Sequence, residues 1–230
     1  MATAEQMAAY AAALRQYKPA QDKPVTEVAI FKLKEAQSAA TLEYFERQII
    51  QNTAPGTGII RQSYGFSLSD PYTLIWMLDW EKIQDHWDFW QTPAFAPVIV
   101  CIDKIFVSGR PLVRHYEFQP SGMLRHSVQK VFVWNDELEA PKAESLVGTK
   151  SNASDRKVAY AVDMQETSWR CAVFGYENKE TAHKDEFVEW EGLEAHLVEL
   201  AFVEKPTQTM KAGFDMAKHG KLYLHSFKRT

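Results

Sequence analysis

Residues 72–95, YTLIWMLDWEKIQDHWDFWQTPAF, decide how the rest of the chain is interpreted. Nearly every side chain of 72–78 is apolar, which is typical of a strand that is buried on both faces. Asp79 then offers an N-cap, because its carboxylate can accept a free backbone N–H at a helix start. Beyond it the apolar spacing changes to three or four residues and predicts one face of a helix, made of Ile83, His86, Trp87 and Trp90. Pro93 can open a second short helix at 94–102.

The composition argues against several classes of function. The chain has 230 residues, of which 46% are hydrophobic and 24% charged, as in an ordinary globular protein of one large or two small domains. Its formal net charge of −4 gives no electrostatic reason to bind nucleic acid or an anionic membrane, because phosphate groups attract a basic surface. We therefore expect neither partner.

The two cysteines do not mark a reactive site or a metal site. Cys101 and Cys171 lie in apolar surroundings, which predicts reduced core residues rather than a disulfide. No C-x-x-C motif or His/Cys cluster occurs in the sequence, so we expect no metal and no cofactor. The start of the chain lacks a basic leader before an apolar core, and the sequence contains no run of about 18 apolar residues. A cytoplasmic location is therefore the default expectation.

Periodicity between residues 25 and 118 predicts the order β-α-β-β-α-β. The elements are a leading helix at 4–16, strands at 25–34 and 58–68, a helix between these strands that stops at 54–56, the central unit, and extended segments at 104–107 and 112–118. This order is the split βαβ or ferredoxin-like arrangement. Residues 1–24 are thus a helix and connector, and 25–118 form a first half.

The same plan recurs in weaker form after a linker at 119–127, which makes 128–230 a second, degenerate half. Its elements are strands at 128–134, 158–164, 169–176 and 197–204, a weak helix at 137–147, a polar helix at 179–189, and an extra polar stretch at 206–219. His183 is the counterpart of His86, but the helix around it is far more polar. We therefore predict an α+β fold of two tandem ferredoxin-like halves packed as an intramolecular α/β barrel, with the pocket in the first half.

The central unit resembles a known family. A strand that ends at Trp80, a helix, and the turn Gln91-Thr92-Pro93-Ala94-Phe95 are similar to the antibiotic-biosynthesis-monooxygenase family of dimeric α/β barrels. The resemblance is good over 25–107 and faint over 128–203. The resemblance implies the fold but does not decide the function. The superfamily includes cofactor-free monooxygenases of anthrones and phenols, haem-degrading enzymes, polyketide cyclases, isomerases and proteins of unknown role.

Several positions of the family motif carry other residues here. Family members often have a histidine at the positions of Phe89 and Ala94, and an acidic residue at that of Leu78. Trp90 occupies the position of the axial histidine in the haem-degrading members, so the resemblance does not imply haem ligation on this helix. The histidine that remains is His86, one turn before Phe89.

Two residues are candidates for catalysis. His86 can take a phenolic or α-carbon proton, since an imidazole titrates near neutral pH. Tyr64 can donate a hydrogen bond from its phenol to a substrate carbonyl or enolate. The alternatives are an inert helix histidine and a buried tyrosine whose hydroxyl group is already satisfied.

Other residues are candidates for binding a flat substrate. Tryptophans of the central unit can stack against an aromatic ring, although each can equally be plain core. Polar and aromatic side chains on the predicted strands and on the first long helix can face the same cavity. The substrate-binding candidates are Trp80, Trp87, Trp90, Phe66, Tyr72, Gln62, Tyr44, Asn52 and His115.

Three functional hypotheses follow. By resemblance, the first is a cofactor-free monooxygenase that acts on a small aromatic or polyketide-type substrate in secondary metabolism. The second is a polyketide cyclase, dehydratase or lyase that uses the same base without O₂. The third is a non-catalytic protein that binds a small ligand. The expected partner is a small hydrophobic aromatic molecule, and a homodimer stays open because the duplication already supplies a sister sheet within one chain.

Overall fold

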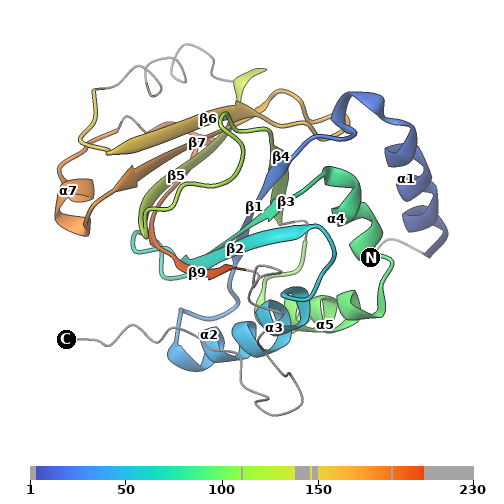
Figure 1. The fold of residues 1–230 in the computed structure, drawn as a ribbon. Coiled ribbons are helices and arrows are strands. Elements are labelled where there is room, and N and C mark those ends of the chain that lie inside the picture. Colours follow the sequence, from blue (N-terminus) through green and yellow to red (C-terminus); the bar gives the residue numbers. More distant parts are fainter. Residues whose placement is uncertain (1–3, 110, 138–145, 147–149, 188, 205–230) are drawn as a thin grey trace, which may run out of the picture.

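The computed structural model describes residues 4–109, 111–137, 146, 150–187 and 189–204. It is an α+β fold in which two antiparallel sheets stack against each other, and helices cover the opposite side of the first sheet (Figure 1). This architecture is consistent with a ferredoxin-like α+β fold, as the predicted order of elements requires.

The first sheet has five strands in the order β4-β1-β3-β2-β9. They are β1 (Val25–Lys32), β2 (Ile59–Phe66), β3 (Thr73–Trp80), β4 (Leu112–Tyr116) and β9 (Ala201–Glu204). Every residue of β3 is buried, and so is every residue of β1 except the last. The prediction that the central strand is buried on both faces is therefore confirmed.

Most helices lie on the side of the first sheet that faces away from the second sheet (Figure 1). Before β1 come α1 (Ala4–Gln16) and the 3-10 turn η1 (Lys18–Ala20). Between β1 and β2 lie α2 (Ala39–Phe45), the π-helical turn η2 (Glu46–Ile50) and α3 (Gln51–Thr53). Between β3 and β4 lie α4 (Ile83–Phe89), the 3-10 turn η3 (Pro93–Phe95) and α5 (Ala96–Ile105).

The second sheet has four strands in the order β6-β7-β5-β8. They are β5 (Val128–Asn135), β6 (Asp155–Tyr160), β7 (Trp169–Tyr176) and β8 (Glu194–Glu199). The short helix α7 (Lys179–His183) packs through Ala182 on the outer face of this sheet. Asn178 opens α7, because its side chain accepts the backbone N–H of Thr181.

Side-chain alternation divides β1 between two cores. Ala29 and Phe31 pack against the helices, whereas Val28 and Ile30 meet the second sheet. The core between the sheets joins residues of both sheets, including Ile75, Met77, Val131, Val133 and Val173. By the same alternation, Glu27 faces the helices.

The end of β3 differs from the prediction. Asp79 is not a helix N-cap, because β3 continues to Trp80 and α4 begins at Ile83. Asp79 Oδ2 instead lies 2.7 Å from Arg61 Nη2 on the neighbouring strand. A buried charge needs a partner, and Asp79 reaches Arg61 because it remains in the strand. The strand also starts later than predicted, so Tyr72 lies in the turn that precedes it.

The end of the first half also differs from the prediction. Residues 104–107 do not form a strand, because α5 continues to Ile105 and buries Val98 and Cys101 as its apolar stripe. The edge of β1 is occupied instead by β4, which pairs antiparallel with it. The segment predicted only as an extension is therefore the fourth strand of the first sheet.

In the second half, the predicted helix at 179–189 ends at His183. The strand predicted at 197–204 is divided into β8 and β9, and β9 joins the first sheet beside β2. The helix predicted at 137–147 falls almost entirely outside the described residues, and the polar stretch at 206–219 falls entirely outside them.

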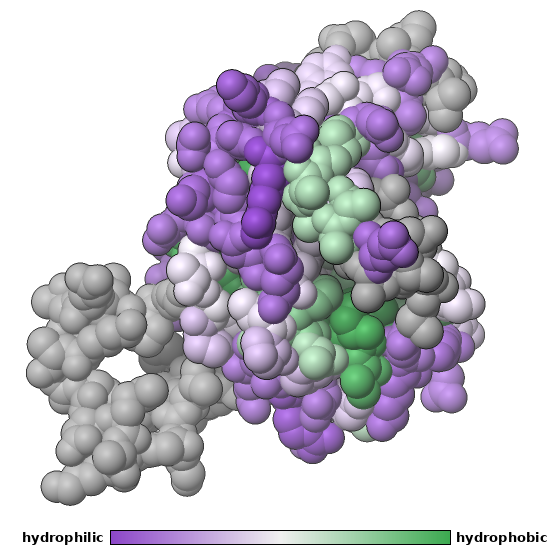
Figure 2. Space-filling model, turned by 90° about the vertical axis from the view of Figure 1, so that its right-hand side faces the viewer, coloured by the Kyte–Doolittle hydropathy of each residue, from purple (hydrophilic) through white to green (hydrophobic). Residues whose placement is uncertain are grey.

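The surface that carries α1 and α5 is mostly hydrophilic, with hydrophobic areas over these two helices (Figure 2). On α5, Ile99 and Val100 are exposed. Within the described part of the chain, no helix has the length and apolarity needed to span a bilayer. Cys101 and Cys171 are buried free thiols, as predicted.

Candidate functional site

Four elements bring a glutamate and two histidines together beneath the helices. Glu27 on β1 lies directly opposite His115 on β4, and side chains of opposed residues in an antiparallel pair lie on the same face. Trp80 ends β3 beside them, and α4 places His86 above the sheet. The three polar residues are buried, with relative exposures of 5% for Glu27, 5% for His86 and 3% for His115. We call Glu27, His86 and His115 the Glu-His-His cluster.

The polar atoms of the cluster converge on one another. His86 Nδ1 lies 2.6 Å from His115 Nε2. Glu27 Oε2 lies 3.7 Å from His86 Nε2 and 3.9 Å from His115 Nε2, which is too far for a hydrogen bond. The same oxygen accepts a hydrogen bond of 2.9 Å from Trp80 Nε1. Glu27 is therefore held in place by an indole and faces two imidazoles without bonding to them directly.

Asp163, which follows β6, fixes the orientation of His115. Its Oδ1 lies 2.7 Å from His115 Nδ1, and its Oδ2 accepts the backbone N–H of His115 at 2.7 Å. This pattern assigns the proton to Nδ1, so Nε2 of neutral His115 carries a lone pair. His86 Nδ1 then donates in the contact between the histidines, and the lone pair of His86 Nε2 is directed to the Glu27 side.

Two tryptophans frame His86. Trp80 stacks on the imidazole with ring centroids 4.9 Å apart, and Trp90 meets it edge-on at 4.6 Å. Tyr10 of α1 stacks on Trp90 in turn, at 6.4 Å. Trp87 is buried in the same helix-side core. Trp80 and Trp90, which were predicted to stack against a substrate ring, therefore limit the rotation of His86 and keep water from it.

Burial and charge act in opposite directions on the groups of the site. Burial raises the pKa of Glu27 above its usual value, although the charge of His115 and the Trp80 hydrogen bond oppose this. Burial, with the nearby charge of His115, holds the pKa of His86 well below its usual range. Burial alone would lower the pKa of His115, but Asp163 and Glu27 outweigh it and raise that pKa. The charge therefore concentrates on the His115–Asp163 pair.

Tyr64 and Gln62 lie apart from the Glu-His-His cluster. Both belong to β2, which β3 and β1 separate from β4. The Tyr64 hydroxyl donates to Glu46 Oε1 at 2.8 Å, and burial together with this partner raises the pKa of the phenol. Gln62 Oε1 accepts hydrogen bonds from Thr53 and from Trp76. The Tyr64 hydroxyl and the Gln62 carbonyl oxygen are thus engaged with η2, α3 and β3.

The remaining sequence candidates are spread over the helix side and the surface. Asn52 donates to the carbonyl of Gln48 within its own helix, at 2.8 Å. The ring of Tyr44 lies beneath Lys104 Nζ, 4.1 Å from the ring centroid. Phe66 lines a cleft of about 340 Å³ beside α2. Tyr72 is 49% exposed. Of the predicted site residues, the structure brings together His86, His115, Trp80 and Trp90.

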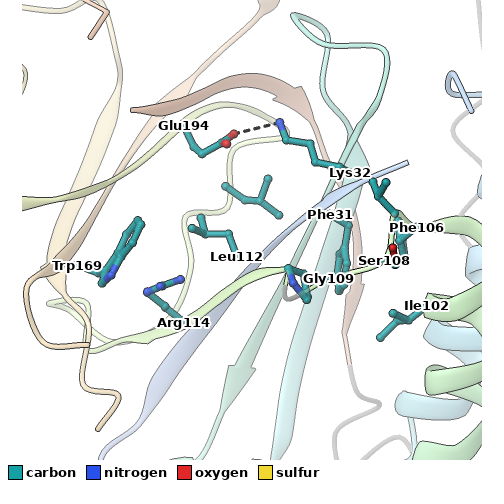
Figure 3. Close-up of a pocket in the computed structure, with 13 residues that line it drawn as sticks. Phe31, Lys32, Ile102, Phe106, Ser108, Gly109, Leu112, Arg114, Trp169 and Glu194 are labelled. Atoms are coloured by element: carbon teal, nitrogen blue, oxygen red, sulfur yellow. Dashed lines mark hydrogen bonds and ion pairs between the residues drawn. The ribbon is translucent and has the colours of Figure 1, made fainter. Parts of the chain in front are cut away.

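A larger cleft of about 390 Å³ opens at the end of β4 (Figure 3). Its walls are apolar side chains such as Phe31, Leu112 and Trp169, with Arg114 stacked 3.8 Å from the centre of the Trp169 ring. Lys32 and Glu194 close one side with an ion pair of 3.1 Å. No residue of the Glu-His-His cluster lines this cleft, because Arg114 and His115 point to opposite faces of β4.

Glu27 and Asp163 were not predicted as site residues. A signal for Glu27 existed, because it is the only charged residue within the apolar run 25–31, and an ionisable group in a buried strand needs a reason. Asp163 gave no such signal, since only the packing of the second sheet on the first brings it to His115, 48 residues away in sequence.

Comparison with known proteins identifies the fold. No family model matches the chain, and no curated protein matches its sequence. An anthrone oxidase-like protein superposes with a TM-score of 0.57 at 13% identity, over 81% of this chain and 95% of its own. A candidate monooxygenase from Fusobacterium nucleatum gives 0.52 at 12% identity, over 80% and 95%. Another, from Lactobacillus acidophilus, gives 0.51 at 8% identity, over 80% and 97%. At these identities the likeness shows a shared fold.

Proposed function

We propose that this chain is a monooxygenase-like enzyme that acts on a small, flat, hydrophobic substrate of aromatic or polyketide type. The observation that carries the proposal is the buried Glu-His-His cluster, held by Asp163 and framed by Trp80 and Trp90. The fold shared with an anthrone oxidase-like protein supports it. So does the resemblance of the central unit to the antibiotic-biosynthesis-monooxygenase family.

The cluster supplies what such a reaction needs. A CH₂ group between aromatic rings must lose a proton or be polarised before it passes electrons to O₂. One oxygen atom then becomes a carbonyl group of the product, and the other leaves with the two hydrogens as water. The indole walls keep bulk water from the electron-rich intermediate. We place His86 at the centre of this chemistry and assign no catalytic role to Tyr64, whose hydroxyl is bonded to Glu46.

Turnover with and without O₂ tests the proposed function. Anthrones, hydroquinones and linear polyketide mimics are incubated with the protein in air and under argon, and the products are analysed by mass spectrometry. We expect a product that gains oxygen in air but not under argon, that carries ¹⁸O when ¹⁸O₂ replaces air, and that forms at least 100-fold more slowly with His86→Ala. His196→Ala is the matched control, because His196 is also buried and paired with a carboxylate, Glu194, but lies outside the cluster.

The other outcomes point to the second and third hypotheses. Water loss or cyclisation at equal rates under argon would contradict the monooxygenase and indicate a cyclase, dehydratase or lyase. Such a reaction needs only proton transfer, for which the His86–His115–Asp163 chain of hydrogen bonds is also suited. Binding of the same compounds without turnover would indicate a ligand-binding protein.

We also propose that the fold is a tandem duplication, with halves at 25–118 and 128–230 joined by a linker at 119–127. Numbered within its own half, each sheet has the strand order 4-1-3-2, seen as β4-β1-β3-β2 and as β8-β5-β7-β6. One chain then supplies both sheets of an intramolecular α/β barrel, so the site does not require a homodimer. Full turnover by a species that light scattering identifies as a monomer is the expected result.

A further inference from the structure

We propose that Glu27, His86 and His115 bind a divalent first-row transition-metal ion. Each residue offers one ligand atom, and the three atoms lie within 4.8 Å of one another. All three side chains are buried and come from three different elements, β1, α4 and β4. The residues are far apart in sequence, which is why no spacing motif reveals them and why no metal was predicted.

The distances suit an ion better than direct hydrogen bonds. Glu27 Oε2 stops 3.7 Å and 3.9 Å short of the two imidazole nitrogens. An ion bound at roughly 2.0–2.2 Å from each donor holds its ligand atoms about 3–3.5 Å apart. The carboxylate therefore needs to move inward by only a few tenths of an ångström. His86 presents Nε2 to Glu27, whereas its Nδ1 contacts His115 Nε2 at 2.6 Å. Rotation of the two imidazole rings would therefore have to replace this contact and direct both Nε2 atoms to the ion.

The surroundings have the features of an outer coordination shell. Asp163 binds Nδ1 of His115 and so leaves the lone pair on Nε2, which faces His86, as carboxylates do behind metal-bound histidines. The Trp80 N–H orients the Glu27 carboxylate at 2.9 Å. Among the described residues, Glu27 has ion-pair contacts with the two histidines alone, and neither lysine nor arginine neutralises it. A cation between these groups would supply the missing positive charge.

The donor set indicates the class of ion. Two imidazoles and one carboxylate suit Fe²⁺, Co²⁺ and Zn²⁺, whereas Ca²⁺ and Mg²⁺ prefer oxygen ligands. Two histidines and a carboxylate with open positions are also the ligands that non-haem iron enzymes use to activate O₂. Fe²⁺ would therefore deepen the proposed function, on which this catalytic meaning rests. The binding of the ion is a separate claim and is tested without activity.

Titration of chelator-treated protein with Co²⁺ under argon tests the site. Co²⁺ absorbs in the visible range when bound by imidazole and carboxylate, so its spectrum reports the ligands directly. We expect one Co²⁺ per chain, a rise in Tm on binding, and competition by Zn²⁺ and Fe²⁺. Glu27→Gln and His115→Ala should each weaken binding at least 100-fold, while His196→Ala should leave it unchanged.

A positioning variant sharpens the test. Asp163→Asn keeps all three ligands but weakens the hold on His115, so we expect a Kd that is higher by about 10- to 100-fold with the visible spectrum retained. Absence of the visible bands in the folded protein, or equal binding by Glu27→Gln, would overturn the proposal. Because Gln has nearly the shape of Glu, that variant remains informative if His115→Ala does not fold. Metal binding by a protein that transfers no oxygen to any compound of the substrate panel would refute the proposed function but not the metal site.

Discussion

Glu27 and Asp79 are two buried carboxylates on neighbouring strands, with exposures of 5% and 3%. Asp79 is saturated: it accepts hydrogen bonds from the Thr26 hydroxyl, the backbone N–H of Met123 and the guanidinium of Arg61. Glu27 accepts one, from Trp80, and faces two histidines beyond hydrogen-bond distance. The hydrogen bonds of Asp79 occupy both of its carboxylate oxygens, whereas the carboxylate of Glu27 has unused lone pairs that could bind a ligand. Binding chemistry is therefore expected at Glu27 and stability at Asp79.

Removal of the Asp79 carboxylate should give the largest loss of stability. Asp79→Ala leaves the buried Arg61 guanidinium without its buried carboxylate and removes an acceptor from Thr26. We expect the free energy of unfolding to fall by about 3–5 kcal/mol, measured by urea denaturation. Replacing both members, in an Arg61→Leu/Asp79→Leu variant, should recover most of the loss. A fall below about 1 kcal/mol for Asp79→Ala would contradict the comparison.

A second saturated carboxylate lies in the other half of the chain. Asp185 accepts from the backbone of Asn152 and, at 3.0 Å, from the Tyr176 hydroxyl. Tyr176→Phe removes one donor from this buried group and should cost about 1–2 kcal/mol in thermal or urea unfolding. Tyr116→Phe is the matched control, because the buried Tyr116 hydroxyl has no hydrogen-bond partner among the described residues. Equal losses for both variants would show that the Tyr176–Asp185 hydrogen bond adds no measurable stability.

At Glu27, which accepts only one hydrogen bond, we expect a small effect on stability and a large effect on metal binding. Glu27→Gln keeps an acceptor for the Trp80 N–H and offers a neutral N–H to the histidines. We expect the unfolding free energy of the metal-free protein to change by less than about 1 kcal/mol, measured by urea denaturation in the presence of a chelator. Co²⁺ binding should nevertheless be lost. A destabilisation as large as that of Asp79→Ala would mean that Glu27 is a structural residue.

The smallest effect is expected at His183, the residue that the proposed duplication makes the counterpart of His86. His183 lies exposed on α7, a helix that buries only Ala182, whereas α4 buries four residues. His183→Ala should alter the unfolding free energy by less than about 0.5 kcal/mol and leave Co²⁺ binding unchanged. A loss of metal binding in this variant would place a second site on α7.

Sequence patterns predicted the helices and strands that are determined by neighbouring residues. The apolar run of β3 and the helix spacing that buries His86 and Trp87 needed no knowledge of distant residues. The errors arose where a distant partner decides. Arg61 keeps Asp79 in a strand, and the packing of α5 extends that helix to Ile105.

The candidate site was predicted in part for the same reason. His86 is conspicuous on an amphipathic helix, and His115 follows from its place in an extended segment. Their pairing with Glu27 depends on the register between β1 and β4, and their link to Asp163 depends on how the two sheets stack. Neither quantity is encoded in a short stretch of sequence.

The pairing of β9 with β2 has a consequence for how the chain is made. Residues 201–204 complete the sheet that carries Glu27 and His115, although this sheet is otherwise built from residues 25–116. During synthesis, the backbone groups at the edge of β2 therefore remain unpaired for on the order of ten seconds, until the ribosome has made β9. During that time the edge is open to pairing with other chains. A chain released before residue 204 would lack part of β9 and would leave the edge of β2 unpaired.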